Sequence, residues 1–443
     1  MKVLMIAPYI YKPDMKEFTK NNTGLGIMIR KTAESISEKE DVILLSRVIT
    51  KGNSGSKDNY RILKHTWKDV FFSAGFKGVC GAIKKFIVFK ANIKEKVRQA
   101  FFILEKGFIS KTIKAINPDV IHIHCIGTIM QSYRDVCDDM NIKYISTLHG
   151  LIGLDETVKA PAYDKQTEVD FLKKSVEEEM PVSVISSGIK ARIEENYLKG
   201  NADNIHVVLN GIDVEKKLDN NENEQNRMGN GKDIITAFED YYYKKLQEDQ
   251  LSNLDSDKLI EHLLEKKKDG YKIAIQVGNI TENKNQIYWC KVVNKEIEDM
   301  QKNKLITVIL GREADGGDLR KYVIDNNLQQ RIILAGFTDR VNSFYNISDI
   351  NIFTSLNDGF GLSIVEGYVY GVPTVTFSDL DAIPDVYNEN AMLVADSRDE
   401  SVFFELVKEA LAKEWDRKWI EEYSKKFSLE IMAENYIDLY KRI

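Results

Sequence analysis

The chain has 443 residues, of which 43% are hydrophobic and 29% charged, a composition typical of folded globular proteins. At about 150 residues per domain, this length predicts two or three domains and excludes a single small module. The 62 basic and 68 acidic residues leave a net charge of -6, which disfavours nucleic acid as the main partner.

The cysteines and the amino-terminal residues indicate a cytoplasmic protein. The four cysteines show no paired spacing, so the sequence indicates neither a disulfide framework nor a metal site. The apolar run 3–7 is too short for the core of a signal peptide. Charged residues interrupt every stretch that approaches the roughly 18 to 20 apolar residues needed to cross a bilayer. We therefore expect no membrane-spanning segment.

Short apolar, β-branched runs alternate with longer helical stretches along the chain, which is typical of parallel strands joined by crossover helices. The polar tract 215–270 separates two series of runs, and we expect it to be a charged insertion with a loop at 220–231 and a helical part at 233–268. Further helices are expected at 400–443. The two series predict two parallel sheets, with strands at 3–7, 42–45, 120–124, 144–148, 182–185 and 205–209, then at 273–277, 307–310, 332–334, 350–354 and 374–377.

Segment 57–114 is more basic than the rest of the chain. It contains 14 Lys or Arg residues against 4 Asp or Glu, a local charge of +10, interleaved with aromatic and aliphatic side chains. An interfacial helix on anionic lipid has this pattern. A pair of amphipathic helices with the apolar stripe facing the core has it as well. The sequence leaves both interpretations open.

Two turns of the first series attract attention because parallel sheets bind ligands at the carboxyl ends of their strands. Gly24 and Gly26 follow the first strand and precede an expected helix at 27–36, where backbone N–H groups can approach an anion, although an ordinary loop explains the glycines equally well. His149 follows a strand directly and can hydrogen-bond a polar substrate or its own loop. His122 and His124 alternate within an earlier strand, and we expect them to be packed or hydrogen-bonded there.

Two turns of the second series form a more specific pattern. Gly278 and Asn279 end one strand, and Lys284 follows six residues after the glycine, within reach of a phosphate over the turn. Another strand ends near 354 and is followed by Asp358, a Gly-Phe-Gly turn and a helix beginning near 362, with Glu366 one turn inside it. Such a helix start offers N–H groups to a diphosphate.

At these residues the sequence resembles the retaining, nucleotide-sugar-dependent glycosyltransferases of family four, which have the GT-B fold. The resemblance implies two Rossmann-like domains facing each other across a cleft, here 1–212 and 213–424, with 425–443 crossing back to the first domain. The segments that carry it occur in family order: 118–124, 209–213, 277–285 and 358–366.

The resemblance also implies roles for these residues. Lys284 would bind the donor diphosphate, with Gly278 and Asn279 as further donor-binding residues, and Glu366 would bind the ribose hydroxyls. Asp358 and His149 would face the transferred sugar. The remaining donor contacts would come from Gly361, Leu362, Ser363, Gly24 and Gly26.

The implied activity is transfer of a hexosyl unit from a nucleoside diphosphate sugar, taken to be UDP-linked, to a hydroxyl of a lipid-linked or growing glycan. The configuration would be retained, the departing phosphate would deprotonate the acceptor, and no cofactor or metal is expected. Localisation would be cytoplasmic, with peripheral contact to the inner face of the membrane through 57–114. No nucleic acid partner is expected.

Three departures from the family pattern leave other functions open. Asp358 stands where the family has glutamate, Asn279 where many members have arginine, and Asp381-Ala382 with Asp385 where a later loop has two glycines and a glutamate. A nucleotide-sugar-binding or scaffold protein with weakened catalysis is one alternative, and a nucleotide-sugar 2-epimerase of the same fold is another.

Overall fold

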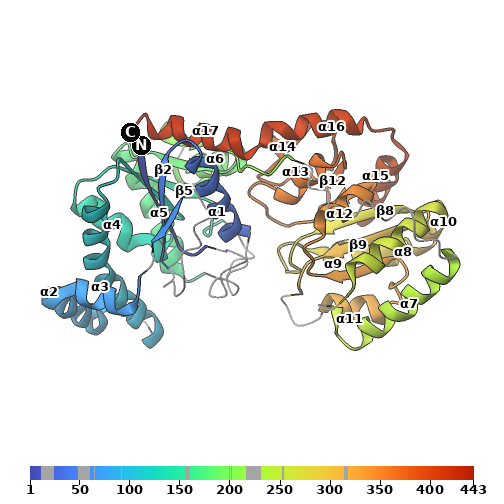
Figure 1. The fold of residues 1–443 in the computed structure, drawn as a ribbon, viewed down its shortest axis with the longest axis horizontal. Coiled ribbons are helices and arrows are strands. Elements are labelled where there is room, and N and C mark those ends of the chain that lie inside the picture. Colours follow the sequence, from blue (N-terminus) through green and yellow to red (C-terminus); the bar gives the residue numbers. More distant parts are fainter. Residues whose placement is uncertain are drawn as a thin grey trace. The chain divides into compact units, whose positions relative to one another are not determined.

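The computed structural model describes residues 1–10, 24–47, 60–63, 65–90, 92–154, 160–198, 200, 202–215, 231–251, 254–313 and 318–443. These residues form two compact α/β units, each built on one parallel sheet (Figure 1). Unit 1 comprises Met1–Gly211 and Leu429–Ile443, and unit 2 comprises Ile212–Ser428. The chain leaves unit 1 one residue before the predicted boundary at 212, and the segment that returns to unit 1 begins at Leu429 rather than at 425.

Unit 1 holds a seven-stranded sheet in the order β3-β2-β1-β4-β5-β6-β7. Its strands are β1 (Lys2–Ala7), β2 (Asp41–Ser46), β3 (Arg61–Leu63), β4 (Val120–His124), β5 (Tyr144–Leu148), β6 (Val182–Val184) and β7 (Ile205–Val207). Its helices are α1 (Gly24–Ser37), α2 (Trp67–Val88), α3 (Ile93–Ile116), α4 (Gln131–Asp139), α5 (Ala162–Glu177), α6 (Ser187–Ile193) and α17 (Leu429–Tyr440), with short helical turns at Thr128–Met130 and Glu194–Leu198.

Unit 2 holds a six-stranded sheet in the order β10-β9-β8-β11-β12-β13. Its strands are β8 (Lys272–Val277), β9 (Leu305–Leu310), β10 (Ile332–Gly336), β11 (Ile350–Ile352), β12 (Thr374–Phe377) and β13 (Met392–Ala395). Its helices are α7 (Gly231–Gln247), α8 (Ser256–Lys268), α9 (Gln286–Lys295), α10 (Ile297–Lys302), α11 (Asp318–Asp325), α12 (Val341–Ile347), α13 (Leu362–Val369), α14 (Ile383–Val386), α15 (Glu400–Ala412) and α16 (Arg417–Ser424), with a turn at Lys425–Phe427.

All eleven predicted strands are present, and every pairing within the two sheets is parallel. Their continuous apolar runs fit strands that helices cover on both faces: every residue of β9 is buried, as are five of the six in β1. The predicted α/β class with two parallel sheets is therefore confirmed.

The tract 215–270 contributes to the core of unit 2. The predicted helical part is confirmed as α7 and α8, while 216–230 lies outside the described residues. Leu259, Ile260 and Leu263 of α8 are buried, and the buried Tyr242 of α7 accepts a hydrogen bond from the Leu334 N–H at 2.9 Å. This tract thus supplies a helical layer of unit 2. No helix among the described residues is long and apolar enough to span a membrane.

Candidate functional site

The strand order of unit 2 reverses between β8 and β11. From β8 the chain runs to β9 and β10 on one side, whereas β11 is followed by β12 and β13 on the other. Ligands of open parallel sheets bind outside the carboxyl ends of the strands at such a switch point. The loops that flank it are 278–285 after β8 and 353–361 after β11, which are the two loops that the sequence analysis selected.

Hydrogen bonds join these two loops. The Asn283 side chain accepts from the Asn357 N–H at 3.0 Å and donates to the Asn357 carbonyl at 2.8 Å. The Leu356 N–H donates to the Asn283 carbonyl at 2.7 Å. The Thr354 hydroxyl donates to the Asn285 carbonyl at 3.0 Å. The two loops are therefore held against each other by groups of their own.

Lys284 and Asp358 form an ion pair across the two loops. The side chain of Lys284 is 31% exposed and that of Asp358 is 14% exposed, so the pair lies at the surface of the site rather than in the core. Burial opposes ionisation of Asp358, but the Lys284 ammonium and the N–H groups of Gly361 and Phe360 outweigh it and lower the pKa of the carboxyl. The Asp358 carboxyl is thus ionised at neutral pH.

Asp358 also fixes the start of α13. Its Oδ1 atom accepts from the Gly361 N–H at 2.6 Å and from the Phe360 N–H at 3.2 Å. Gly361 has a φ of 72°, a left-handed conformation in which a Cβ would lie 2.8 Å from the Ile364 side chain, so glycine is required here. The next N–H groups, of Leu362 and Ser363, lie in the first helical turn, where N–H groups have no acceptor within the helix.

Glu366 lies one turn further along α13. It is partly exposed, as is Leu362 four residues earlier, whereas Ser363, Ile364 and Val365 between them are buried. Residues four apart share one helix face. Leu362, at the start of α13, and Glu366 therefore lie on the same accessible side of that helix.

The ends of β8 and β9 approach closely next to Lys284. Gly278 has a φ of 145°, and a Cβ added to Gly311 would lie 2.0 Å from the Gly278 carbonyl oxygen. Asn279 accepts a hydrogen bond from the Arg312 N–H at 3.4 Å, and the Arg312 guanidinium lies 4.5 Å from the ring centroid of the exposed Phe337. The sequence analysis did not single out Arg312, although its position after a strand-ending glycine was visible.

Arg398 is a second residue that the sequence analysis missed. Its guanidinium donates to the Ser355 carbonyl at 2.9 Å and forms a two-point ion pair with Asp379 at 2.9 and 3.1 Å. It also lies 4.1 Å from the ring centroid of Phe377. Arg398 therefore binds the loop after β11 to the loop after β12. Nothing local in the sequence indicates this contact, because it joins residues 43 positions apart.

In unit 1, three histidines cluster at the carboxyl ends of β4 and β5. His122 contacts the Tyr440 hydroxyl at 2.7 Å and the Thr147 hydroxyl at 2.6 Å. His124 Nδ1 lies 3.0 Å from His149 Nε2. The prediction that His122 and His124 are packed and hydrogen-bonded within their strand is confirmed, and His122 additionally attaches α17 to the sheet.

The cluster is held neutral by its surroundings. Burial lowers the pKa of His122 to about 3 and that of His149 to about 4. Burial also lowers the pKa of His124 well below its ordinary value, with the neighbouring histidines adding to the effect. His149, the partly exposed member, can therefore offer a neutral hydrogen-bonding group to a substrate. Across the part of the chain that is described, no group of three or more His, Cys, Asp or Glu side chains is arranged to hold a metal ion.

Gly24 and Gly26 do not precede the helix, contrary to the expectation that it begins at 27. Helix α1 begins at Gly24, so both glycines lie in its first turn. Glycine has no Cβ, so it leaves the unpaired N–H groups of this first turn open to close approach by a ligand. Residues 21–23, which complete the predicted turn, lie outside the described residues.

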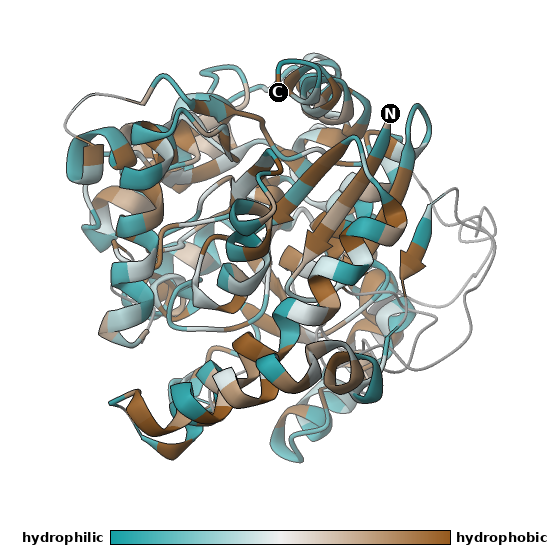
Figure 2. Cartoon of the chain, turned by 90° about the vertical axis from the view of Figure 1, so that its left-hand side faces the viewer, coloured by the Kyte–Doolittle hydropathy of each residue, from teal (hydrophilic) through white to brown (hydrophobic). Residues whose placement is uncertain are grey.

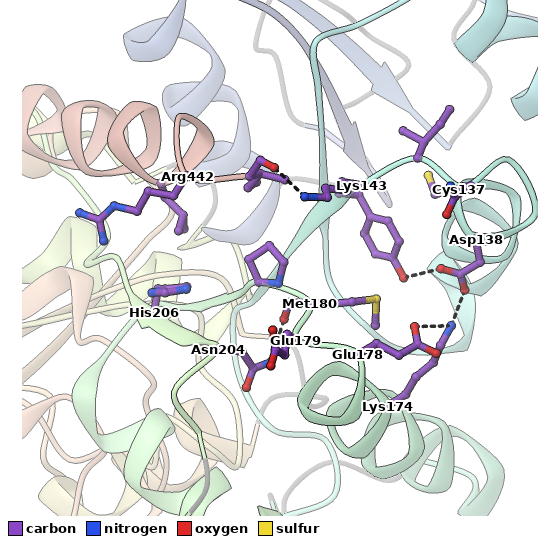
Figure 3. A pocket seen from close by; sticks show the side chains of 16 residues that line it. Cys137, Asp138, Lys143, Lys174, Glu178, Glu179, Met180, Asn204, His206 and Arg442 are labelled. Atoms are coloured by element: carbon purple, nitrogen blue, oxygen red, sulfur yellow. Dashed lines mark hydrogen bonds and ion pairs between the residues drawn. The ribbon is translucent and has the colours of Figure 1, made fainter.

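A separate cavity of about 490 Å³ lies in unit 1, near the amino ends of β5, β6 and β7 (Figure 3). Lys174 lies 2.6 Å from Asp138 and 3.6 Å from Glu178 on its wall, and Lys143 donates to the Ile443 carbonyl at 3.0 Å. This is the opposite edge of the sheet from the histidine cluster. None of the predicted site residues lines the cavity.

Comparison with known families identifies the class of protein to which this fold and site belong. Residues 260–427 match the family described as glycosyl transferases group 1, and residues 81–216 match Glycosyltransferase Family 4. The first match contains the whole of the site on unit 2, and the second contains the histidine cluster. The chain belongs to the group 1 glycosyltransferases of the GT-B fold.

Individual relatives are more distant. The chain is 31% identical over 104 residues to the poly(glycerol-phosphate) alpha-glucosyltransferase of Bacillus subtilis, which is 24% of this chain and 15% of that protein. It is 28% identical over 118 residues to an Escherichia coli UDP-Gal:alpha-D-GlcNAc-diphosphoundecaprenol alpha-1,3-galactosyltransferase, which is 26% of this chain and 30% of that protein. The chain thus spans less than a third of either relative's length.

Among solved structures, Anabaena HepE in complex with UDP superposes with a TM-score of 0.61 at 12% identity. The match covers 100% of both chains. At this identity the likeness concerns the fold alone.

Proposed function

We propose that this protein is a glycosyltransferase that moves a hexosyl unit from a UDP-sugar to a hydroxyl of a lipid-linked or growing glycan. The observation that carries the proposal is that the Lys284 ammonium and the amino end of α13 are both held by Asp358 at the switch point of the sheet. The names of the relatives support the choice of substrates, since one acts with UDP-Gal on a diphosphoundecaprenol-linked sugar and a structural neighbour binds UDP.

The chemical demand of this reaction is the stabilisation of the departing diphosphate. The Lys284 ammonium and the N–H groups of Leu362 and Ser363 would supply positive potential to that group. Many family members have an arginine at the position of Asn279. In this chain Arg312, which follows β9, would supply that second positive charge instead. The negative charge of the diphosphate would thus be compensated by residues of this chain.

The remaining residues take the roles that the family resemblance assigns. Glu366 would accept hydrogen bonds from the ribose hydroxyls. Asp358, which the resemblance places facing the transferred sugar, would in addition hold Lys284 and the start of α13 in position. His149 would donate a hydrogen bond from a neutral imidazole to a hydroxyl of the substrate.

The bond changes follow the retaining course. The bond between the anomeric carbon and the diphosphate oxygen breaks, and the acceptor oxygen forms its bond to the same carbon on the same face. The acceptor proton passes to the departing phosphate, so no protein side chain is assigned as general base. We further propose that the protein works in the cytoplasm at the inner face of the membrane.

A thermal-shift screen against UDP-, GDP- and ADP-sugars tests the donor assignment, because a ligand that binds the native state raises its melting temperature. We expect the largest shift with a UDP-sugar. Release of UDP on addition of a lipid-linked acceptor would then identify a transferase. Binding without release would favour the scaffold alternative, and a new sugar formed without acceptor would favour the epimerase.

A further inference from the structure

Helix α2 exposes its apolar side chains instead of burying them. Of its 22 residues, only Val70 and Ala82 are buried. Eleven of the eighteen large hydrophobic side chains that are exposed among the described residues lie between 67 and 97. These are Trp67, Phe71, Phe72, Phe76, Val79, Ile83, Phe86, Ile87, Val88, Ile93 and Val97. We call these eleven residues the apolar patch.

The core-helix interpretation of segment 57–114 is therefore wrong for α2 and for the first turns of α3. It holds for the rest of α3, where Phe102, Phe108, Ile109 and Ile113 are buried. Figure 2 shows hydrophobic residues along the foreground helices at the bottom of the view, where Figure 1 has α2 and α3. The segment therefore divides into an exposed half, which is α2 with the first turns of α3, and an anchoring half, which is the rest of α3.

In the exposed half, α2 consists of two helical segments joined by a kink at Gly75, which has a φ of 61°, and both segments pack on α3. Thr66 and Asp69 cap the start of α2 reciprocally, and Asn92 caps α3 through the Glu95 N–H at 3.0 Å. A Cβ added to Gly107 of α3 would lie 2.4 Å from the Ser73 carbonyl oxygen, so the two helices pack as closely as backbones allow. Exposure of the apolar patch is thus a property of folded helices that are capped and packed together.

An apolar hollow lies between the two helices. It has a volume of about 760 Å³ and is lined on both sides by members of the patch, among them Trp67, Ile83, Phe86 and Val97. Lys94 and Arg98 also contribute to its wall. The hollow is large enough to take hydrocarbon and has cations beside it.

The charge around the patch identifies what covers it. Between 67 and 104 there are eight Lys or Arg residues, Lys68, Lys77, Lys84, Lys85, Lys90, Lys94, Lys96 and Arg98, against Asp69 and Glu95. The chain as a whole has a charge of -6. Two copies of the chain meeting at this surface would bring like charges together, which is unfavourable. An anionic lipid surface is complementary to both the charge and the apolar side chains.

We propose that α2 and the first half of α3 dock the protein on an anionic bilayer. The side chains of the apolar patch enter the boundary between headgroups and acyl chains, and the lysines extend toward the lipid phosphates. Docking would bring the enzyme to the surface that holds a lipid-linked acceptor. In this respect the docking proposal rests on the proposed function. The docking itself requires no nucleotide.

The test is sedimentation of the full-length protein with vesicles of phosphatidylcholine alone and with 30% phosphatidylglycerol, in the absence of nucleotide. We expect binding that depends on the anionic lipid. Phe76→Ser with Ile87→Ser removes two exposed apolar side chains and should lower the partition coefficient at least ~10-fold. Lys84→Glu with Lys85→Glu should lower it by a similar factor. Val402→Ser with Ile431→Ser, exposed on α15 and α17, is the matched control and should leave it unchanged.

A local signal comes from Trp67. Subtracting the fluorescence emission spectrum of Trp67→Phe from that of the wild type isolates the emission of Trp67. This emission should shift to the blue with anionic vesicles, since that indole leaves water. The proposal is overturned if the Phe76/Ile87 and control variants sediment equally, or if the patch instead mediates self-association that the Phe76/Ile87 variant abolishes. UDP binding, measured without vesicles, is expected to be the same in every variant. Failure of the docking proposal is therefore distinguishable from failure of the transferase proposal.

Discussion

The carboxyl edges of the two sheets differ in electrostatic character. In unit 2 the edge at the switch point carries the ionised pair Lys284 and Asp358 and the free N–H groups at the start of α13. In unit 1 the corresponding edge carries His122, His124 and His149, which burial keeps neutral. The same kind of sheet thus offers fixed charge in one unit and neutral hydrogen bonds in the other, which is why the proposal assigns the diphosphate to unit 2.

Of the substitutions considered, removal of the Lys284 ammonium should change UDP binding the most. Lys284→Ala is expected to weaken UDP binding by about 1.5 to 3 kcal/mol, or about 10- to 150-fold in Kd, since a charged hydrogen bond to the diphosphate is lost. Titration calorimetry with UDP measures it. Lys291→Ala, on the exposed surface of α9, is the matched control. An unchanged Kd for Lys284→Ala would reject the site.

Glu366 should contribute to the nucleoside half of the same site. Glu366→Ala is expected to weaken UDP binding about 10-fold, because its hydrogen bonds to the ribose hydroxyls are lost. The analogue 2′,3′-dideoxy-UDP lacks those hydroxyls, so wild type and variant should bind it equally. An equal loss of affinity for UDP and for the analogue would mean that Glu366 acts through the fold of α13 rather than on the ribose.

Asp358 should affect stability more than nucleotide binding. Asp358→Asn keeps an oxygen for the Gly361 N–H but removes the charge that pairs with Lys284, and should lower the free energy of unfolding by about 1 to 2 kcal/mol. It also releases the ammonium from its partner in the protein, so the Kd for UDP should be unchanged or lower. Urea unfolding and calorimetry on one preparation measure both. Weakened UDP binding would show that Asp358 itself contacts the donor.

Much of the fold could be predicted from the sequence because buried parallel strands have a strong local pattern. Run 3–7 is apolar throughout and run 307–310 is apolar after its first residue, and both are strands. Two strands were missed. β3, at Arg61–Leu63, is a three-residue edge strand that is only partly covered. β13, at Met392–Ala395, has one β-branched residue, so its pairing with β12 decides its conformation.

The loops of unit 2 could be located from sequence, but not the contacts between them. Lys284, Asp358 and Glu366 lie next to strand ends, and strand ends are visible in the sequence. The pairing of Lys284 with Asp358 joins residues 74 positions apart, as does the bond from Asn283 to the Asn357 carbonyl. Contacts of this kind depend on strand order, which single-sequence periodicity does not specify.

The smallest effect concerns the pH dependence of unit 1, where neutral histidines and a buried carboxyl act in opposite directions. His122 and His149 have folded pKa values of about 3 and 4, below the ordinary 6.5, so they contribute stability above pH 6.5 that is lost as the pH falls. Burial raises the pKa of Glu105 to about 7, beside Arg47 and Ser132, so stability from its protonated form is lost as the pH rises from 4.5 to 7.

Glu105→Gln separates these two contributions. The variant also changes the contact with Arg47, so the readout is the slope of the unfolding free energy against pH and not its value. Without the opposing carboxyl, the loss of stability between pH 6.5 and 5 should be steeper than in the wild type, by up to about 1 kcal/mol per pH unit. Glu177→Gln, exposed on α5, is the control and should leave the slope unchanged. Equal slopes for wild type and Glu105→Gln would mean that Glu105 is already ionised throughout this range, and that the neutral character of this edge rests on the histidines alone.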